Sequence, residues 1–393
     1  MQQLTTDVLV IGSGGAGLRA AIEARACGTS VLVLDKKKPG LASTTYWAAS
    51  DWMAFGAAVG HADPADSPEQ HYLDICAKGG LVSDPELSHI VAYEAPDRVE
   101  DLTRWGMDWD REPDGRYRQI LSDGATYPRA LGKGAETGKR IVEVLLERAV
   151  QLGCMVLGGW RLADLLADEK GVLALCLSAS QEDWLLVRAK AAVIATGGMG
   201  ALFAANIFPQ GLFGEATIAA LSAGAKLVNM EFIQIGPGSM WPMKFALSGV
   251  FWRLAPQITN GLGEEFLGQY MPEGVDLAHA LWVKGVSYPY TVRNESQYVD
   301  RAIFHELAKG RGAEHGGVFL SLAHNPPEVI ETDARVPFEF WLKHGVDLRR
   351  DALEFAPCCQ HFNGGLLIDS TASVGVPGLY AAGEAAGDRK SVV

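Results

Sequence analysis

Cysteine is scarce in this sequence and never closely paired. Six Cys are scattered through 393 residues, and none of them forms a CxxC pair. This spacing argues against a disulfide framework and against a metal or iron–sulfur centre held by the chain. Free thiols are typical of a reducing compartment. We therefore expect no metal and a cytoplasmic location.

Long apolar runs are also missing. No uninterrupted apolar run approaches the roughly 18 residues that a transmembrane helix needs. The N-terminus, MQQLTTD, lacks the basic region with which a secretion signal begins. We therefore expect a soluble protein that is not inserted directly into a membrane.

Positive charge is in short supply. The chain has 34 Lys and Arg against 47 Asp and Glu, a formal net charge of −13, and its longest basic run is only Lys36–Lys38. A surface that binds phosphate backbones or anionic lipids needs clustered Lys and Arg. The balance therefore excludes nucleic acid as the main partner, and we interpret the short basic run as a solvated loop.

A strand, a glycine-rich turn and a helix follow one another at the start of the chain. Residues 5–11 (TTDVLVI) predict a buried strand, GSGGAG follows, and an Ala-rich helix and a second strand ending at Asp35 complete a βαβ unit. In this motif Gly12 permits the tight turn, Gly14 allows a pyrophosphate to approach the backbone, and Gly17 allows close packing of helix and sheet. Asp35, 18 residues beyond Gly17, is placed to accept hydrogen bonds from a ribose. The sequence thus predicts a dinucleotide site on a Rossmann-type α/β domain.

The rest of the chain predicts an interrupted domain. Periodicity and caps indicate helices at 69–78, 85–105, 137–152 and 214–223. Residues 154–195 predict a small antiparallel sheet that returns to a core strand ending at Thr196. A stretch rich in Trp, Pro and Gly follows, with weaker periodicity. We therefore predict a first domain interrupted by a capping domain, with the segments 1–236 (cofactor domain), 237–345 (capping domain) and 346–393 (return of the cofactor domain).

Two further strand-to-glycine junctions favour FAD over NAD. Ala195-Thr196-Gly197 ends one predicted core strand, and Gly383-Glu384 ends another. Such junctions let additional backbone segments touch the nucleotide, and the Glu384 carboxylate could meet a ribityl hydroxyl. An NAD fold does not need these extra crossings, whereas an extended FAD laid across the sheet does.

The motifs together resemble one family, the flavoprotein subunits of succinate dehydrogenase and fumarate reductase; its relatives include L-aspartate oxidase and the α chain of adenylylsulfate reductase. The resemblance covers nearly the whole chain and is carried by GSGGAGLRAAIEA, GLVSDPELSHIVAYEAPDRVEDLTRWGMDWDR, PRALGKGAETGKRI, AVIATGGMGALF, AGAKLVNMEFIQ, RAIFHELAKGRG, HFNGGLLID and GLYAAGEAAG. It implies an FAD-dependent oxidoreductase with a Rossmann-type FAD-binding domain and an inserted α+β capping domain. The sequence ends at Val393, before the glycine-rich segment and the C-terminal helical domain that follow in the family, so we expect that domain to be absent here.

The resemblance also implies how FAD is held. Respiratory members attach FAD covalently through a His in a Ser/Thr-rich segment, and here Thr44 stands where that His would fall. We therefore expect non-covalent FAD. The candidate contacts are Gly12, Gly14, Gly15, Ala16, Gly17, Asp35, Lys36, Ser43, Thr44, Thr45, Ala48, Ala195, Thr196, Gly197, Glu215, Gly383 and Glu384.

The substrate residues depart from the family pattern. Relatives that act on four-carbon dicarboxylates use two His and two Arg, but here Gly236 replaces the first His and the cap Arg falls on Ser296, with Arg293 as a nearby stand-in. Only the second His survives, as His361. Each charge-assisted contact contributes roughly 1.5–3 kcal/mol, so their loss argues against succinate or fumarate as the substrate.

Two residues are the candidate catalytic groups. His361 could anchor the substrate or donate a proton near the flavin, or it could be a buried structural His. Arg253 could be a cationic substrate ligand, or a surface or core-capping Arg. The neighbouring Cys358-Cys359 could be a redox pair, but we favour small residues that fill a tight turn, since vicinal disulfides are strained.

Two functions of different classes are compatible with this pattern. The first is an FAD-dependent oxidoreductase for a small organic substrate, with an iron–sulfur subunit or a quinone as an electron-transfer partner. The second is a catalytically impaired member that binds FAD or a partner protein. Retention of the nucleotide motifs fits both hypotheses.

Overall fold

The computed structural model describes residues 1–47, 54–122, 124–287 and 290–387. Its main sheet has seven strands in the order β6-β2-β1-β9-β8-β7, and β17 pairs with β9. The pairs formed by β6, β2, β1, β9 and β17 are parallel, whereas β7, β8 and β9 are antiparallel neighbours. The strands are β1 (Gln2–Ile11), β2 (Val31–Asp35), β6 (Met155–Gly158), β7 (Trp160–Asp168), β8 (Gly171–Ser178), β9 (Trp184–Ile194) and β17 (Leu379–Ala381).

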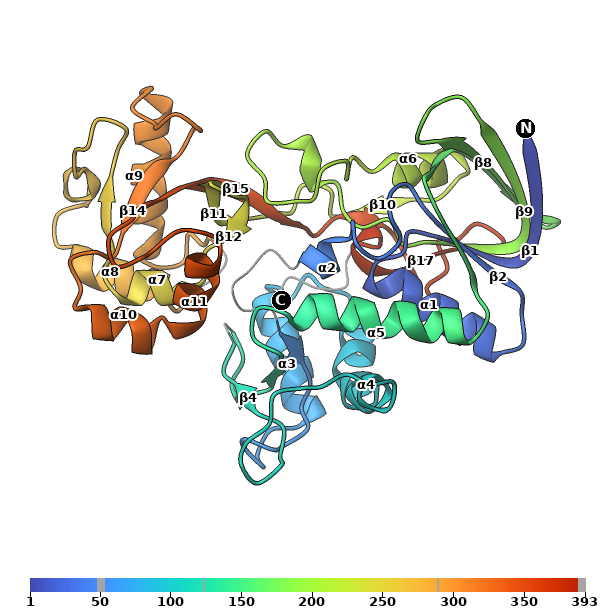
Figure 1. The fold of residues 1–393 in the computed structure, drawn as a ribbon, viewed down its shortest axis with the longest axis horizontal. Helices are drawn as coiled ribbons and strands as arrows, with labels where there is room; N and C mark the ends of the chain where they lie inside the picture. The colour runs from blue at the N-terminus through green and yellow to red at the C-terminus, as the bar shows by residue number, and fades with distance from the viewer. Residues whose placement is uncertain (48–53, 123, 288–289, 388–393) are drawn as a thin grey trace.

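Helices cover both faces of this sheet, which explains why its central strands are apolar on both sides. On one face α1 (Gly15–Ala26) packs beside α5 (Thr137–Gln151) over the sheet, with buried Leu18, Ile22 and Leu145 in one core. On the other face α6 (Glu215–Ser222) packs against β7 through a separate core that includes Ala216 and Leu165. Figure 1 shows α1 and α5 on one side of the sheet and α6 on the other.

A helical lobe lies beneath α1 and α5. It contains α3 (Pro68–Lys78) and α4 (Pro85–Arg104), whose first turns are capped by the side chains of Ser67 and Asp84. Pro at the first helical position and an Asp or Ser cap are the expected start signals of a helix. The lobe also holds a small sheet of β3 (Phe55–Gly56), β4 (Gln119–Ile120) and β5 (Ala130–Leu131).

A second, independent core forms the capping region, which we define as the segment from the start of β11 to the end of β15. Its five-stranded sheet has the order β12-β11-β15-β14-β13, and its buried aromatic residues include Trp252, Trp341 and Phe355. Figure 1 shows this region at the opposite end of the molecule from the seven-stranded sheet, connected by the long strands β11 and β15. The capping elements are β11 (Ile233–Trp241), β12 (Phe245–Ala246), α7 (Gly249–Arg253), β13 (Gln257–Thr259), α8 (Leu277–Lys284), α9 (Ser296–Ala308), β14 (Val318–Ser321), α10 (Pro327–Asp333), α11 (Arg335–Lys343) and β15 (Leu353–Phe362).

The remaining elements connect these units. A short pair of β10 (Leu227–Val228) and β16 (Gly365–Leu366) lies next to α6, α2 (Thr44–Trp47) follows β2, and three 3-10 turns are η1 (Gly200–Leu202), η2 (Leu267–Tyr270) and η3 (Gly383–Ala385). Within the described ranges, no helix combines the length and the apolar character needed to cross a bilayer.

Most predicted elements are confirmed, including the antiparallel strands β7, β8 and β9, but two details of the stretch 154–195 were wrong. The four predicted helices correspond to α3, α4, α5 and α6, with ends that differ by at most one residue. Residues 155–158, however, form a parallel edge strand paired with β2, and the core strand ends at Ile194 rather than Thr196. The physical reason is the length of β9. Its 11 residues pair with β1 on one side and β8 on the other, so the antiparallel strands extend the main sheet.

Candidate functional site

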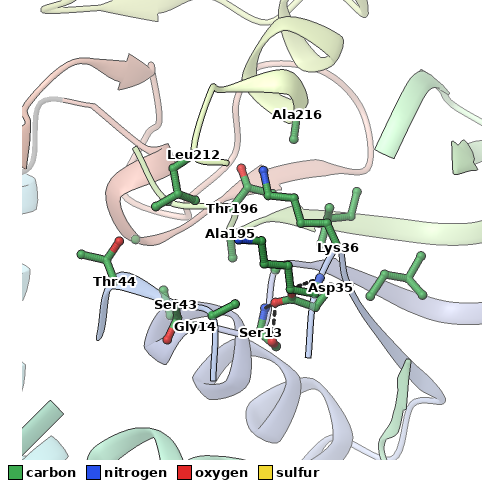
Figure 2. Close-up of a pocket in the computed structure, with 18 of the residues that line it drawn as sticks. Ser13, Gly14, Asp35, Lys36, Ser43, Thr44, Ala195, Thr196, Leu212 and Ala216 are labelled. Atoms are coloured by element: carbon green, nitrogen blue, oxygen red, sulfur yellow. Dashed lines mark hydrogen bonds between the residues drawn. The ribbon is translucent and has the colours of Figure 1, made fainter. Parts of the chain in front are cut away.

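The three predicted backbone junctions meet in one pocket. The turn after β1, the segment after β9 and the segment after β17 all line it, and Figure 2 shows the side chains of Ser13, Asp35, Ser43 and Thr196 around the same space. Residues 12–16, 195–197 and 383–384 therefore lie side by side although they are far apart in the sequence.

Two glycines make this arrangement possible. Gly12 has a φ of +106°, and a Cβ there would lie 2.2 Å from the carbonyl oxygen of Ala195. A Cβ on Gly17 would lie 2.0 Å from the carbonyl oxygen of Gly12. Because heavy atoms cannot approach so closely, only glycine lets α1 begin directly against β1 and β9.

The N-terminus of α1 faces this pocket without a side-chain cap. Its N-cap residue is Gly14, which makes no capping hydrogen bond, and the first N–H groups of a helix have no partner within the helix. These groups and the partial positive charge of the helix end favour a phosphate. The pocket therefore fits the pyrophosphate of the expected cofactor.

Asp35 has partners within the chain that the sequence did not reveal. Its Oδ2 accepts hydrogen bonds from the backbone N–H of Ser13 (3.0 Å) and from the Ser13 hydroxyl, and its Oδ1 accepts one from the Lys37 N–H (2.9 Å). The Ser13 hydroxyl in turn accepts a hydrogen bond from the N–H of Gly40 (2.7 Å). Asp35 thus fixes the glycine turn, and its contact with a ribose stays a prediction. The one sequence feature that could have indicated these hydrogen bonds is Ser13, which stands between two glycines of the motif.

The segment expected to lie over the flavin forms α2 and its cap. The Ser43 hydroxyl donates to the carbonyl oxygen of Gly40 (2.8 Å) and accepts from the N–H of Tyr46 (3.1 Å). Thr44 and Thr45 line the pocket, whereas Ala48 lies outside the described residues. The hydroxyls of Thr44 and Thr196 are buried and make no hydrogen bond with a described residue. Buried hydroxyls usually have partners, so these two fit a polar cofactor in the pocket.

Lys36 and Glu215 close one end of the pocket. The Lys36 ammonium lies 3.2 Å from the Glu215 carboxylate and also donates to the carbonyl oxygen of Gly211. Both side chains are about one-quarter to one-third exposed, at 26% and 32%. The contact joins the end of β2 to the start of α6, so the structure brings these two candidate residues together.

The cofactor pocket shares a wall with a much larger cleft. The cleft lies between the part of the chain around the seven-stranded sheet and the capping region, and it has a volume of about 1930 Å³. The residues that line both spaces are Ala16, Thr44, Thr45, Gly383 and Glu384. A cofactor bound along the glycine turn would therefore reach the cleft at this shared wall.

Both candidate catalytic residues line the cleft. His361, at the end of β15, is 30% exposed, and its Nδ1 lies 3.0 Å from Oε1 of Glu384. Arg253 is in the last turn of α7, is exposed and makes no ion pair with any described residue. His361 is thus only partly buried and is held by a carboxylate, while Arg253 offers a free positive charge to the cleft.

The positions that depart from the family pattern differ in whether they reach the cleft. Arg293 lines the cleft, with its guanidinium next to Gly80 of the helical lobe. Ser296, in contrast, is fully buried and donates its hydroxyl proton to Asn294. Gly236 is buried in β11 opposite Cys358. Ser296 and Gly236 therefore present no charged group to the cleft.

Three amide side chains in the cleft were missed by the sequence reasoning. Gln234 donates its amide N–H to Gln360 (3.0 Å), and Asn363 lines the same wall. The side-chain oxygens of Gln234 and Asn363 are buried and have no hydrogen-bond partner among the described residues. The only feature of the sequence that could have indicated them is that they stand close to His361 or to Gly236, which replaces the first His of the family.

The tight turn proposed for Cys358 and Cys359 was wrong. Both residues lie inside β15, paired with Gly236 and Ile235 of β11. They are 2% and 3% exposed, and the Cys358 thiol donates to the carbonyl oxygen of Gly236 (3.5 Å). The Cys358 sulfur packs directly against Gly238 of β11, where an added Cβ would lie only 2.2 Å from it. Packing between the two strands, not a turn, explains the pair.

The buried thiols are expected to be unreactive. Burial raises the pKa of Cys358 and of Cys359 to about 12, so each stays a neutral thiol at pH 8. Their thiolate fraction is then on the order of 10³-fold below that of an ordinary thiol. We expect an aromatic disulfide reagent to modify the exposed Cys27 of the native protein at least 100-fold faster, a conservative bound on that ratio. Peptide mapping would check this, and equal labelling would contradict it.

Comparisons with known proteins agree with this geometry. The family model described as "FAD binding domain" matches residues 7–391. The chain is 34% identical to a fumarate reductase (CoM/CoB) chain of Methanothermobacter marburgensis, over 97% of this chain and 67% of that one. It is 29% identical to the L-aspartate oxidase of Streptomyces coelicolor, over 98% of this chain and 63% of that one.

A solved structure shows the same fold. The structure of Mycobacterium smegmatis Sdh1 in complex with UQ1 superposes with a TM-score of 0.80 and 30% identity, covering 99% of this chain and 65% of that one. The chain thus spans about two thirds of the length of the relatives it matches. The protein belongs to this family of FAD-dependent oxidoreductases, and its cofactor is FAD.

Proposed function

We propose that the protein holds FAD without a covalent bond and moves two electrons between it and a small organic substrate in the cleft. The observation that carries the proposal is the wall shared by the FAD pocket and the cleft, formed by residues of α1, α2 and η3. Bound FAD would supply the two-electron chemistry there. Thr44, which lines both spaces, has a hydroxyl in place of the imidazole needed for covalent attachment.

We propose further that the substrate is neither succinate nor fumarate. A dicarboxylate needs charged contacts at both ends, each contributing roughly 1.5–3 kcal/mol. The absence of charge at Gly236 and Ser296 supports a substrate with at most one carboxylate. His361 and Arg253 are the residues we propose for its binding and protonation, and the amides of Gln234 and Gln360 suit a polar neutral group.

One observation favours a second candidate, fumarate reduction. The relative at 34% identity is named as a fumarate reductase (CoM/CoB), and its match covers almost the whole of this chain. Arg293 and Arg253 could then supply the cationic contacts that the replaced residues do not. The two candidates differ in one respect, namely whether a second carboxylate on the substrate is recognised.

We also propose an electron-transfer partner, either an iron–sulfur subunit or a quinone, and a cytoplasmic location. The solved structure of Sdh1 in complex with UQ1 supports the first proposal by similarity. The six free thiols, five of them wholly or partly buried, support the second, because free thiols persist in reducing compartments.

Reoxidation of the reduced protein tests the substrate. We expect FAD-loaded protein, reduced anaerobically with dithionite, to be reoxidised by crotonate at least as fast as by fumarate, which differs by one carboxylate. Stopped-flow absorbance of the flavin would measure both rates. A rate with fumarate more than about 100-fold higher would show that a second carboxylate is bound, since two such contacts predict a ratio of at least that size. Reoxidation by neither acid, nor by a quinone, would favour a member that binds FAD without catalysis.

A further inference from the structure

Three polar side chains lie side by side on one face of the β11–β15 pair. Gln234 pairs directly with His361, and the backbone N–H of Asn363 donates to the carbonyl oxygen of Phe232, which continues the ladder. Side chains of directly paired residues share a face, and so do those of residues two positions apart on one strand. Gln234, His361 and Asn363 accordingly all line the cleft.

A β-bulge adds a fourth polar side chain. Ile235, which follows Gln234, pairs with Cys359, so Gln360 is an extra residue on β15. Because a bulge changes the regular alternation of side chains, Gln360 lines the cleft as well as its neighbour His361. The Gln360 side-chain oxygen accepts the amide N–H of Gln234 at 3.0 Å. We call Gln234, Gln360 and Asn363 the amide wall.

Two oxygens of the amide wall are buried acceptors to which no described residue donates. Gln234 is 4% exposed, and its amide nitrogen is used by the contact with Gln360, whereas its Oε1 has no hydrogen-bond partner in the described part of the chain. The same is true of Oδ1 of Asn363. An unpaired buried acceptor is costly, and native proteins rarely keep one. Both oxygens therefore fit a ligand group that donates hydrogen bonds.

The charged groups of the cleft indicate what else the ligand carries. Arg253, in the last turn of α7, offers a positive charge to the cleft, which suits one carboxylate. Glu231, three residues before Gln234 in the chain, also lines the cleft and is exposed. Its negative charge repels a second carboxylate near the amide wall and attracts an ammonium group.

We propose that the substrate is a small monocarboxylic acid with a hydroxyl or amino group, and that Gln234 and Asn363 bind this donor beside His361. A hydroxyl can donate to one of the two oxygens, and an ammonium group can donate to both. An ether oxygen or a second carboxylate has no proton to donate and would leave both oxygens unpaired. The inference rests on the proposed function, because it names the class of substrate for that site.

Ligand binding to the oxidised protein tests the proposal without turnover. The probes share one carbon skeleton: 4-hydroxycrotonate, 4-aminocrotonate, 4-methoxycrotonate and crotonate. Isothermal titration of the full chain loaded with FAD would give each Kd. We expect the tighter of the hydroxy and amino acids to bind at least about tenfold more tightly than the methoxy acid, which keeps an oxygen but has no donor. That acid also identifies which donor is recognised. A methoxy acid that binds as tightly as both donor acids, or binding of none of the probes, would overturn the proposal.

Single variants of the amide wall identify the acceptors. Gln234→Leu and Asn363→Leu each remove one acceptor, and we expect at least one of them to lower the preference for the donor acid about fivefold or more. An undiminished preference in both would contradict the assignment. Asn363 follows the last residue of β15, so its variant covers a failure of Gln234→Leu to fold. Thr332→Val is the matched control, because the Thr332 hydroxyl lines the cleft but donates to the carbonyl oxygen of Glu328 in its own helix (2.8 Å).

The FAD dissociation constant, measured by flavin fluorescence, separates this role from a cofactor contact. We expect both amide variants to change it by less than about threefold. A loss of FAD affinity of about tenfold or more, with the preference for the donor acid unchanged, would make these amides cofactor ligands and overturn the proposal. Reoxidation of the reduced protein tests the proposed function separately, and its failure would leave the binding preference of the oxidised protein unchanged.

Discussion

Replacing Gly17 by Ala is expected to abolish FAD retention and to destabilise the protein strongly. The new Cβ would lie 2.0 Å from the carbonyl oxygen of Gly12 and 3.2 Å from the Cβ of Ala195. Both neighbours belong to the pocket wall, and one is backbone that cannot rotate away. The helix would have to move off the sheet, and its N–H groups would no longer face the pyrophosphate. Overpacking of this kind costs roughly 1–3 kcal/mol or more, even though Ala is the better helix former.

The matched control lies in the same helical turn. A Cβ on Gly15 would lie 3.3 Å from Thr45 side-chain atoms, which can adjust, so we expect Gly15→Ala to change the free energy of unfolding by no more than about 1 kcal/mol. Denaturant unfolding would compare the two variants, and the ratio of flavin to protein absorbance after gel filtration would report retention for Gly17→Ala. A Gly17→Ala protein with wild-type stability and full flavin content would show that the close approach of α1 is not required.

Replacing Arg129 by Met is expected to lower the free energy of unfolding by about 3–5 kcal/mol, as for other buried ion pairs that lose one partner. Arg129 is 2% exposed, and one of its guanidinium nitrogens lies 2.8 Å from both Asp66 and Asp74. It joins the segment before β5 to α3 in the helical lobe. Without it two carboxylates remain close together with no compensating charge.

The control is an Arg that forms an exposed pair. Arg335 and Glu339 are 71% and 61% exposed, so Arg335→Met should cost less than about 1 kcal/mol. Urea unfolding of both variants and of the wild type would measure the difference. Equal changes in the free energy of unfolding for the two substitutions would show that burial of the ion pair does not determine the loss of stability.

The difference in the free energy of unfolding between wild type and the Arg129→Met variant should become smaller as the pH falls. Burial raises the pKa of Asp74, but hydrogen bonds from Thr126 and Gln70 and the charge of Arg129 outweigh it, so the net pKa is lowered. A carboxyl group whose pKa is lower in the folded than in the unfolded state stabilises the protein at pH values above its unfolded-state pKa. This stabilisation is lost as the pH falls through the folded-state pKa. Burial raises the pKa of Asp66 in spite of Arg129, so ionisation of Asp66 opposes folding and acid relieves it. Protonation of Asp74 and of Asp66 therefore reduces the difference in the free energy of unfolding between variant and wild type at low pH.

Local patterns predicted the elements that local physics controls. The apolar β-branched run of β1, the glycine turn and the cap residues of α3 and α4 act within a few residues of themselves, so the sequence alone indicated them. The same holds for Gly12 and Gly17. The spacing of the glycine motif alone predicted that these two positions cannot carry a Cβ.

Contacts between distant segments could not be predicted in this way. The sequence placed Cys358 and Cys359 in a turn because it could not show that β11 would pair with β15 at these residues. It did not predict the contact between Glu384 and His361, 23 residues earlier, because only the bulge at Gln360 and the return of β17 to the main sheet bring the two side chains together. Ser13 and Asp35 meet for the same kind of reason, across the β1–β2 pair.

The sequence by itself thus determined that this is an FAD-binding α/β protein, because steric limits on a turn and the period of buried strands are properties of neighbouring residues. Only the tertiary structure decided which polar groups face the cleft and which of them form hydrogen bonds with other parts of the protein. These outcomes depend on distances between segments separated by tens to hundreds of residues, and such distances are fixed only when the sheet and the capping region pack together.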